Sequence, residues 1–331
     1  MPPIYNTVRH LFIINPKSFR HKWKQVKAVT KIHDFFKLAE NNNYEIHISR
    51  FPRDAACFIP LYAEKLGKET TLRVYAVGGD GILFDCLNGV MGLENAELAA
   101  IPYGHTNNFV RAFRKNDKSL FQSIPRQYHS PAIPLNVMRC GNNYALNCCA
   151  VGLEADAALR AGKMRERMDR GSIFMQWLGR RLYTSLYIIG GLISCWNKKL
   201  LNRQYEVEID GNIISGNYWG LSVFNGPVYG GNMRPVNNAV PDDGILDILL
   251  TRVRKIITYF LFPFYITGRY KIFPGIFTLK QGRKVSIRCE EPLVISMDNE
   301  VFFENELSVE LLPSAVKFVN AGRHDYTGGW K

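Results

Sequence analysis

Glycines in the first third of the chain directly follow an apolar run. Residues 72–77 (LRVYAV) lead into Gly78, Gly79, Asp80 and Gly81, and a short helical pattern comes next. Residues without side chains let the backbone turn sharply and let an anion approach the amides, and the free N–H groups at a helix start favour negative charge. The segment predicts a phosphate-binding loop, and the alternative is a tight turn that binds nothing.

Two further polar loops also follow apolar runs. Asn15, Pro16 and Lys17 come after residues 11–14, and a run at 99–102 precedes a loop that contains Gly104, His105, Thr106 and Asn107. The carboxyl ends of parallel strands form the ligand-binding edge of an open α/β sheet, so we expect the three loops to converge. Their spacing fits neither the Gly-x-Gly-x-x-Gly motif of dinucleotide-binding domains nor a P-loop.

The elements that position these loops alternate between strands and helices. Helical patterns at about 23–41 and 55–66 are interleaved with strand patterns at 44–49 and 72–77. This order is typical of a parallel sheet with helices on both faces.

The sequence pattern changes near residue 132. Short β-type runs separated by Gly, Asn or Pro predict a mainly antiparallel β-sandwich, with a basic helical insert at about 160–201. We therefore expect an α/β domain at 1–131 and a β-rich domain at 132–314. The last residues, 315–331, are expected to return to the first domain.

Composition and charge indicate a globular protein with an anionic partner. The chain has 331 residues, 47% of them hydrophobic, and 42 Lys and Arg against 29 Asp and Glu give a net charge of +13. Nucleic acid, a phosphorylated small molecule and an anionic membrane surface are the candidate partners. The basic residues form no recognisable nucleic-acid module, so no nucleic acid is expected. Seven scattered cysteines without a Cys-x-x-Cys pair predict a reducing, cytoplasmic location.

Two uncharged stretches, 182–196 and 256–268, raise the question of a membrane. A helix rises about 1.5 Å per residue, so neither stretch reaches across a hydrocarbon core roughly 30 Å thick. Their basic flanks favour peripheral association with an anionic bilayer, and buried core segments are the alternative. The flanking cations are Arg180, Arg181, Lys198, Lys199, Arg252, Arg254, Lys255, Arg269 and Lys271.

Several motifs in one order resemble the diacylglycerol kinase catalytic family, which includes bacterial soluble diacylglycerol kinases, related lipid kinases and sphingosine kinases. Asn-Pro-x-Ser at 15–18, Gly-Gly-Asp-Gly at 78–81 and Pro-x-Gly-x-x-Asn-x-Phe at 102–109 come first. A glycine-rich segment at 225–235 and the turn Asp-Asp-Gly-x-Leu-Asp at 242–247 follow. The resemblance implies an ATP- and Mg²⁺-dependent kinase that phosphorylates a lipid hydroxyl, with diacylglycerol giving phosphatidic acid as the default reaction. The β-rich domain would take the lipid.

The resemblance also implies roles for the three loops. The residues that would hold the nucleotide are Asn15, Pro16, Lys17, Gly78, Gly79, Asp80, Gly81, Gly104, His105, Thr106 and Asn107. The negative charge of Asp80 would repel phosphate oxygens if nothing lay between them, so Asp80 would ligate Mg²⁺ or make an orienting hydrogen bond.

Two acidic motifs complete the implied site. Asp298 and Glu300 stand where the family carries its Asp-Gly-Glu and would supply the base. Residues two apart in a strand share a face, so we expect a coupled pair with one raised pKa; an exposed pair at a strand end is the alternative. The side chain of Asp243, with the carbonyls of Val240 and Ile245, resembles a structural Mg²⁺ site, although such a turn is often only a turn.

Departures from the family pattern keep other readings open. Residues that differ from the usual small or polar groups are Phe19, Ile82, Phe84, Asp85, His105, Asn108 and Asn299. They favour the alternative of a catalytically weakened relative that binds nucleotide or lipid and regulates another process. NAD kinases share a related glycine loop, but Asn15-Pro16 and the long β-rich half favour the lipid branch. A homodimer is left open.

Overall fold

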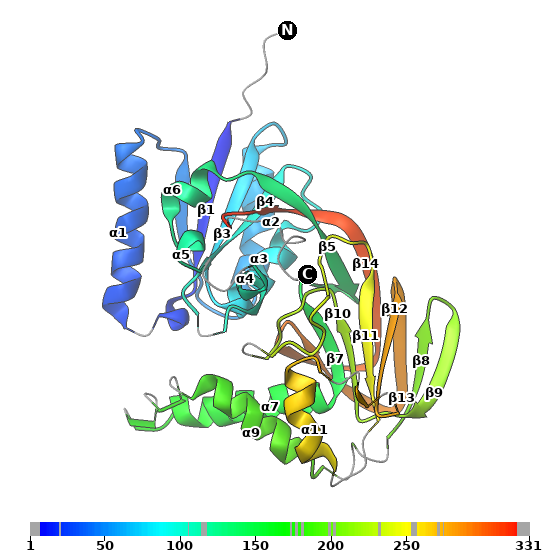
Figure 1. Cartoon of the computed structure of the whole chain (residues 1–331). Helices are drawn as coiled ribbons and strands as arrows, with labels where there is room; N and C mark the ends of the chain where they lie inside the picture. The colour runs from blue at the N-terminus through cyan, green and yellow to red at the C-terminus, as the bar shows by residue number, and fades with distance from the viewer. Residues whose placement is uncertain are drawn as a thin grey trace. The chain divides into compact units, whose positions relative to one another are not determined.

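The computed structural model describes residues 7–322 except 20, 105, 114–117, 173, 176, 177, 180, 181, 198, 199, 201, 202, 231, 232, 253–256, 270, 271 and 274. The described residues form two compact units (Figure 1). Residues 7–135 and 314–322 make unit 1, and residues 136–313 make unit 2.

Unit 1 is built on a parallel sheet. Its strands are β1 (Val8–Ile14), β2 (Tyr44–Ile48), β3 (Thr71–Gly78), β4 (Ala96–Pro102) and the end of β14 (Glu300–Val319). They lie in the order β14-β4-β3-β1-β2, and every pairing in this part of the sheet is parallel. Strand β3 is buried almost throughout, as expected for a strand covered on both faces.

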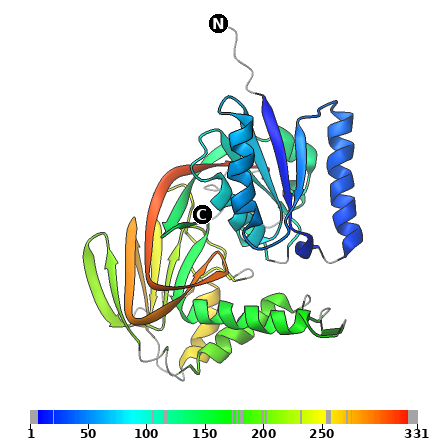
Figure 2. The same ribbon diagram turned by 180° about the vertical axis from the view of Figure 1, so that it is seen from behind.

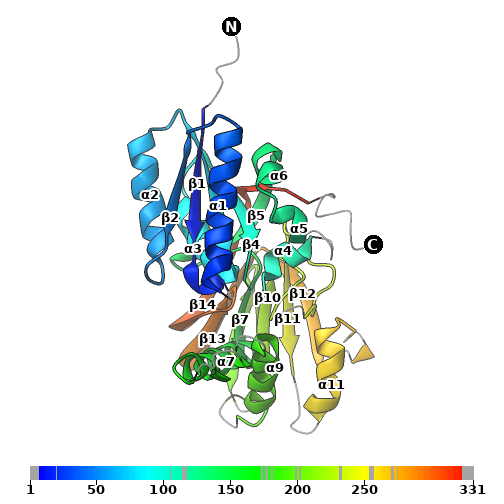
Figure 3. The same ribbon diagram turned by 90° about the vertical axis from the view of Figure 1, so that its left-hand side faces the viewer.

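Helices cover both faces of this sheet (Figure 3). They are α1 (Lys22–Leu38), α2 (Asp54–Leu66), α3 (Asp80–Val90), α4 (Asn108–Ala112), α5 (Lys118–Phe121) and α6 (Ile124–His129), with a 3-10 turn at Pro16–Ser18. Helix α1 buries Ala28, Ile32 and Phe36, spaced four residues apart, against Phe12 and Tyr75 of the sheet. This single apolar stripe leaves the rest of α1 in solvent.

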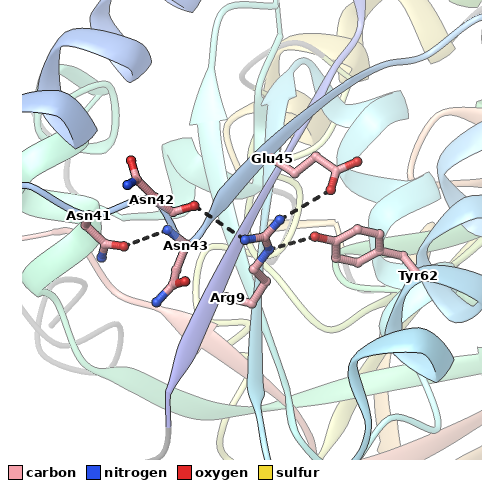
Figure 4. A network of polar contacts seen from close by, with 6 residues as sticks. All are labelled: Arg9, Asn41, Asn42, Asn43, Glu45 and Tyr62. Atoms are coloured by element: carbon pink, nitrogen blue, oxygen red, sulfur yellow. Dashed lines mark hydrogen bonds and ion pairs between the residues drawn. The ribbon is translucent and has the colours of Figure 1, made fainter.

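The edge of the unit 1 sheet is held by a polar network (Figure 4). Arg9 of β1 donates to the Tyr62 hydroxyl of α2 (Nε to Oη, 2.8 Å) and pairs with Glu45 of β2 at 3.5 Å. The side chain of Asn41 accepts from the Asn43 amide at 2.8 Å just before β2 begins. These contacts tie the edge strand to its neighbours away from the carboxyl ends of the strands.

Unit 2 is mainly antiparallel. Its strands are β5 (Ala132–Cys140), β6 (Asn143–Ala145), β7 (Cys148–Gly152), β8 (Gln204–Ile209), β9 (Asn212–Asn217), β10 (Gly220–Phe224), β11 (Leu246–Thr251), β12 (Phe277–Gly282), β13 (Lys284–Met297) and the first part of β14. They run in the order β12-β11-β10-β7-β13-β14, with β8 and β9 added beside β13. The predicted fold class, a parallel α/β part and an antiparallel β-sandwich, is confirmed.

Helices α7 (Leu153–Asp169), α9 (Tyr183–Ser194) and α11 (Ile257–Ile266) belong to unit 2 (Figure 2). Helix α7 follows β7 at once and begins seven residues before the predicted insert. No helix in the described part of the chain combines the length and hydropathy needed to cross a bilayer.

The first uncharged stretch divides its residues between core and solvent. Leu186 and Tyr187 of α9 are buried, whereas Ile189 and Ile193 are more than 40% exposed. In the second stretch, Leu261 and Tyr265 are buried. Of the flanking cations, Arg252 donates to the Tyr218 hydroxyl and Arg269 is exposed. The other seven lie outside the described residues.

Candidate active site

Three loops of unit 1 meet at the carboxyl ends of β1, β3 and β4. The amide of Asn15 donates to the Val77 carbonyl at 3.1 Å, which joins the first loop to the end of β3. The amides of Tyr103 and Gly104 both donate to the Gly78 carbonyl at 2.8 Å, which joins the third loop to the same place. The loops at 15–18, 78–81 and 104–109 therefore form one cluster.

The three loops can lie this close together because several of their residues are glycines. A Cβ atom on Gly78 would lie 2.7 Å from Ser18 Oγ and 2.8 Å from Ile82 Cγ2. A Cβ atom on Gly104 would collide with the Cα of Gly79. Gly104 is thus required by the close approach of its backbone to that of Gly79, whereas a side chain on Gly78 would meet the side chains of Ser18 and Ile82. Gly79 places no side chain at the start of α3.

Asp80 begins α3 and points toward the third loop. Its carboxylate accepts a 2.5 Å hydrogen bond from the Thr106 hydroxyl and further hydrogen bonds from the amides of Asn108 and Phe109 at the start of α4. Burial raises the pKa of Asp80, and these three donors oppose that rise. Of the two roles expected for Asp80, the orienting hydrogen bond is the one visible here.

Some of the remaining residues of the loop cluster make hydrogen bonds within the loops, and others are exposed. The Asn15 side chain accepts from the Lys17 amide at 3.0 Å, and Pro16 starts the 3-10 turn. Asn107 has a φ of 48° and donates to the Gly104 carbonyl at 2.6 Å. Lys17 is exposed, and Gly81 lies in the first turn of α3. His105 lies outside the described residues.

Apolar departures from the family pattern are part of the core of unit 1. Ile82 and Phe84 are 2% and 1% exposed, and Phe19 packs on the Tyr103 ring with centroids 4.8 Å apart. Asp85 accepts a 2.9 Å hydrogen bond from the Arg53 amide at the start of α2. Each of these side chains therefore has a packing role.

The hairpin at 298–299 corrects an expectation about the acidic pair. Strand β13 ends at Met297 and β14 begins at Glu300, so Asp298 and Asn299 are the turn between them, with φ values of 49° and 74°. Two successive residues with positive φ are typical of a type I′ hairpin turn. Asp298 and Glu300 thus do not share one face of a strand, and the predicted coupling on that basis is wrong.

Asp298 is held by backbone amides of a distant segment. Its carboxylate accepts from the amides of Leu146, Asn147 and Cys148 at 2.7–2.9 Å. Its own amide donates to the Cys148 carbonyl at 2.9 Å. Hydrogen bonds to a carboxylate are charge-assisted and stronger than neutral ones. They fix this carboxylate in one orientation.

Glu300 is exposed and borders a cavity within unit 2. The cavity has a volume of about 470 Å³ and lies against α7, α9 and the β13–β14 turn. Its lining includes the apolar groups of Ala158, Leu186, Tyr187 and Val301 and the charged groups of Lys163, Arg165, Glu166 and Glu300. Such a mixture suits a ligand with both apolar and polar parts.

The turn at 240–245 folds around Asp243. One carboxylate oxygen accepts from the Ile245 amide at 3.0 Å, and the Asp243 amide donates to the Val240 carbonyl at 3.4 Å. Burial raises the pKa of Asp243, and burial also raises that of nearby Asp247, with the charge of Asp243 adding to that rise. Carboxylate and carbonyl oxygens, such as those of this turn, are the donors that a hard cation prefers.

The described residues hold no group of three or more His, Cys, Asp or Glu that could bind a metal ion. The predicted ligands Asp243, Val240 and Ile245 would supply one carboxylate and two backbone carbonyls, which are oxygen donors of the type that Mg²⁺ prefers.

Sequence reasoning missed a buried polar cluster in unit 2. Glu154, in the first turn of α7, is 4% exposed and accepts a 2.6 Å hydrogen bond from the Tyr265 hydroxyl. The hydroxyls of Tyr187 and Tyr229 bond to each other and to the Glu154 carbonyl. Burial raises the pKa of Glu154, and the hydrogen bond from Tyr265 opposes the rise. An acidic residue in the first turn of a helix is common. Only the burial of Glu154, which the sequence does not show, distinguishes it from such residues.

Together, a glycine loop on a parallel α/β unit and an antiparallel β-sandwich define a kinase fold of the diacylglycerol kinase and NAD kinase type. Two domain families match parts of the chain. The diacylglycerol kinase catalytic domain matches residues 9–138, and the YegS C-terminal NAD kinase beta sandwich-like domain matches residues 187–320.

Relatives and solved structures agree with this assignment. A protein of Staphylococcus aureus strain JH9, named a putative lipid kinase, is 25% identical over 254 residues, which cover 74% of this chain and 76% of that protein. A crystal structure described as a putative diacylglycerol kinase from Bacillus anthracis superposes with a TM-score of 0.68 at 22% identity, covering 94% of this chain and 96% of that one. A second one from that organism has a TM-score of 0.66 at 23% identity and the same coverage.

Proposed function

We propose that this protein is an ATP-dependent lipid kinase that transfers the γ-phosphoryl group to a lipid hydroxyl, with diacylglycerol as the default acceptor and phosphatidic acid as the product. The match of residues 9–138 to the diacylglycerol kinase catalytic domain and the names of the relatives support the reaction class. The observation that carries the proposal is the mutual contact of the loops at 15–18, 78–81 and 104–109.

The nucleotide phosphates would be held by this loop cluster. The open amides at the start of α3 and the exposed Lys17 offer donors and positive charge to an anion. The Thr106 hydroxyl donates a hydrogen bond to the Asp80 carboxylate, so the role of this pair is to fix the third loop against the glycine loop. Mg²⁺ bound with ATP would neutralise the charge on the phosphates, which is its usual contribution to phosphoryl transfer.

The proton of the attacking hydroxyl would be received by the acidic hairpin. Asp298 is the oriented carboxylate, and Glu300 is the exposed one. A base for a lipid hydroxyl must be both accessible and oriented, so we assign the two residues a joint role. The cavity beside Glu300 would accept part of the lipid, because its apolar lining suits an acyl chain and its charged groups suit a polar headgroup.

Two further assignments belong to this proposal. The turn at Asp243, with the carbonyls of Val240 and Ile245, would bind a structural Mg²⁺. The protein would work in the cytoplasm and associate peripherally with an anionic membrane surface, where its lipid substrate resides.

A catalytically weakened regulatory relative is the second candidate. Ile82 and Phe84 bury apolar side chains where the family usually has polar ones, so two polar groups beside the phosphate loop are absent. Such a relative would bind nucleotide without turnover.

Transfer of labelled phosphate from ATP to vesicles tests both candidates. The vesicles contain diacylglycerol, ceramide or sphingosine, and wild type is compared with Asp298→Asn and Glu300→Gln. The kinase proposal expects one lipid to be phosphorylated by wild type and a loss of at least 100-fold in Asp298→Asn. Nucleotide binding without turnover on any lipid would overturn the kinase and favour the regulatory relative.

A further inference from the structure

The outer face of α1 combines unpaired lysines with an exposed tryptophan. The helix carries Lys22, Lys24, Lys27, Lys31 and Lys37 and a single carboxylate, Asp34. In the part of the chain that the structure describes, none of these lysines makes an ion pair or a hydrogen bond.

Trp23 lies among these lysines. It is 59% exposed, and Val26, one turn further on, is 57% exposed. The Lys24 ammonium lies 5.5 Å from the centroid of the Trp23 ring. Spacings of three and four residues place Trp23, Val26 and Lys27 on one side of the helix. The stripe of Ala28, Ile32 and Phe36 faces the sheet.

The charge of this face does not serve the stability of the helix. The first turn of α1 contains no acidic residue, and the N-cap, His21, makes no side-chain capping bond. Because the N-terminus of a helix carries partial positive charge, Lys22 and Lys24 lie at its unfavourable end. A cluster of cations that costs the helix stability points to an anion outside the protein.

Helix α7 offers an internal comparison. It is also basic, but Arg160 pairs with Asp156, Arg165 with Asp169 and Arg170 with Glu166, each four residues apart on the helix. Those arginines are neutralised within their own helix. Among the described residues, α7 retains two exposed cations without an ion pair, Lys163 and Arg167, whereas α1 has five.

We propose that the outer face of α1, formed by Lys22, Trp23, Lys24, Val26, Lys27 and Lys31, is the surface that docks on an anionic lipid bilayer. Lysine stems cover apolar surface while their ammonium groups reach the headgroups, and tryptophan prefers the interface. Val26 and Trp23 add apolar area that a nucleic-acid backbone would leave unused, so charge and hydrophobicity together favour lipid. The inference deepens the proposed peripheral membrane association and rests on it.

The location of α1 gives this docking a consequence for the loop cluster. The 3-10 turn at Pro16–Ser18 ends four residues before Lys22, in the same unit. A bilayer that holds the start of α1 therefore also holds the loop at 15–18 close to its surface.

Vesicle co-sedimentation tests the proposal with the full-length protein. Vesicles of phosphatidylcholine alone are compared with vesicles that contain phosphatidylglycerol. The triple variant Lys24→Glu, Lys27→Glu, Lys31→Glu should lower the partition coefficient on anionic vesicles by at least about 100-fold, since each basic residue near such a surface contributes about fivefold. Trp23→Ala should lower it by about tenfold.

Two controls keep failure informative. Lys65→Glu, Lys68→Glu, Lys280→Glu makes the same change in net charge at exposed lysines elsewhere and should lose much less binding. The α1 variant should also unfold no earlier than wild type, because glutamates near a helix N-terminus are favourable. A loss of binding without a loss of stability then belongs to the face itself.

The outcomes separate the surface from the wider proposal. If wild type fails to bind anionic vesicles, membrane association itself is wrong. If wild type binds and the α1 variant binds equally well, the proposed face is wrong. Brominated lipids should quench less fluorescence in Trp23→Phe; a decrease in Trp196→Phe alone would place the contact at the end of α9, where Trp196 is 75% exposed. Tighter lysine-dependent binding to duplex DNA than to vesicles would replace lipid with nucleic acid.

Discussion

The loop cluster of unit 1 and the acidic hairpin of unit 2 are fixed in opposite ways. In unit 1, the backbone of Gly104 approaches that of Gly79 so closely that Gly104 has no room for a side chain. In unit 2, the Asp298 carboxylate accepts hydrogen bonds from three backbone amides of a segment about 150 residues away in the chain. The first arrangement is sensitive to added volume, and the second is sensitive to lost charge.

The largest effect should come from adding one methyl group to the loop cluster. Gly104→Ala places a Cβ atom against the Cα of Gly79, where only backbone could move away. We expect a loss of about 3 kcal/mol of stability and of nucleotide binding, measured by denaturant unfolding and by ATP titration. Gly275→Ala is the control, because nothing lies within 4 Å of its added Cβ. Equal effects of both changes would show that backbone contact is not what the loop requires.

Removal of charge from the hairpin should have the next largest effect. Asp298→Asn turns an acceptor oxygen into an NH₂ group that faces amide donors, so we expect a loss of about 1–3 kcal/mol of stability together with activity. Glu300→Gln should lower activity and leave the unfolding midpoint unchanged, because Glu300 is exposed. Denaturant unfolding and vesicle kinase assays measure the two effects. A stable Asp298→Asn protein would contradict the structural part of this assignment.

The buried cluster around Glu154 should give unit 2 a pH dependence of its own. Burial raises the pKa of Glu154, so its contribution to stability is complete below the unfolded pKa of a glutamate, about 4.3, and is lost as pH rises through the folded pKa. Glu154→Gln cannot titrate, so it should gain stability relative to wild type as the pH rises from about 4.5 to about 7.5. Thermal unfolding at both pH values measures this gain.

The control for this comparison is Glu166→Gln, which changes an exposed glutamate of the same helix. If both variants show the same pH dependence, burial of Glu154 is not its origin.

The smallest effect concerns the turn at Asp243. If it holds Mg²⁺, millimolar Mg²⁺ should raise the unfolding midpoint of wild type, by about 1–3 kcal/mol of stability, and should leave Asp243→Asn unchanged. The neighbouring exposed residue gives a matched control, Asp242→Asn, which should keep most of the response. If Mg²⁺ does not change the unfolding midpoint of wild type, the structural Mg²⁺ site is wrong. The proposed kinase activity would not be affected by that result.

Local sequence was a good guide to the loop cluster. The strands before Asn15 and Gly78 are continuous apolar runs, and the glycines and polar residues after them mark where the chain turns. Parallel order then brings these ends together without any information about side-chain contacts. The meeting of the three loops was predictable for this reason.

The hairpin and the buried cluster depend on distant partners. The prediction placed Asp298 and Glu300 on one face of a strand, although Asp298 and Asn299 both adopt positive φ and turn the chain. The amides that hold Asp298 come from residues 146–148, and the hydroxyl that reaches Glu154 comes from Tyr265. No local pattern contains such pairings, so sequence could suggest Asp298 only by resemblance and could not suggest Glu154 at all.

Strand β14 divides its length between the two units. Its residues up to Pro313 belong to unit 2, and its last residues pair with β4 in unit 1 through Lys317 and Phe318. A ribosome that makes the chain from the N-terminus therefore releases unit 2 before the missing strand of unit 1 exists. Unit 1 can therefore complete its sheet only after the last residues of β14 have been made, although its first four strands are translated first.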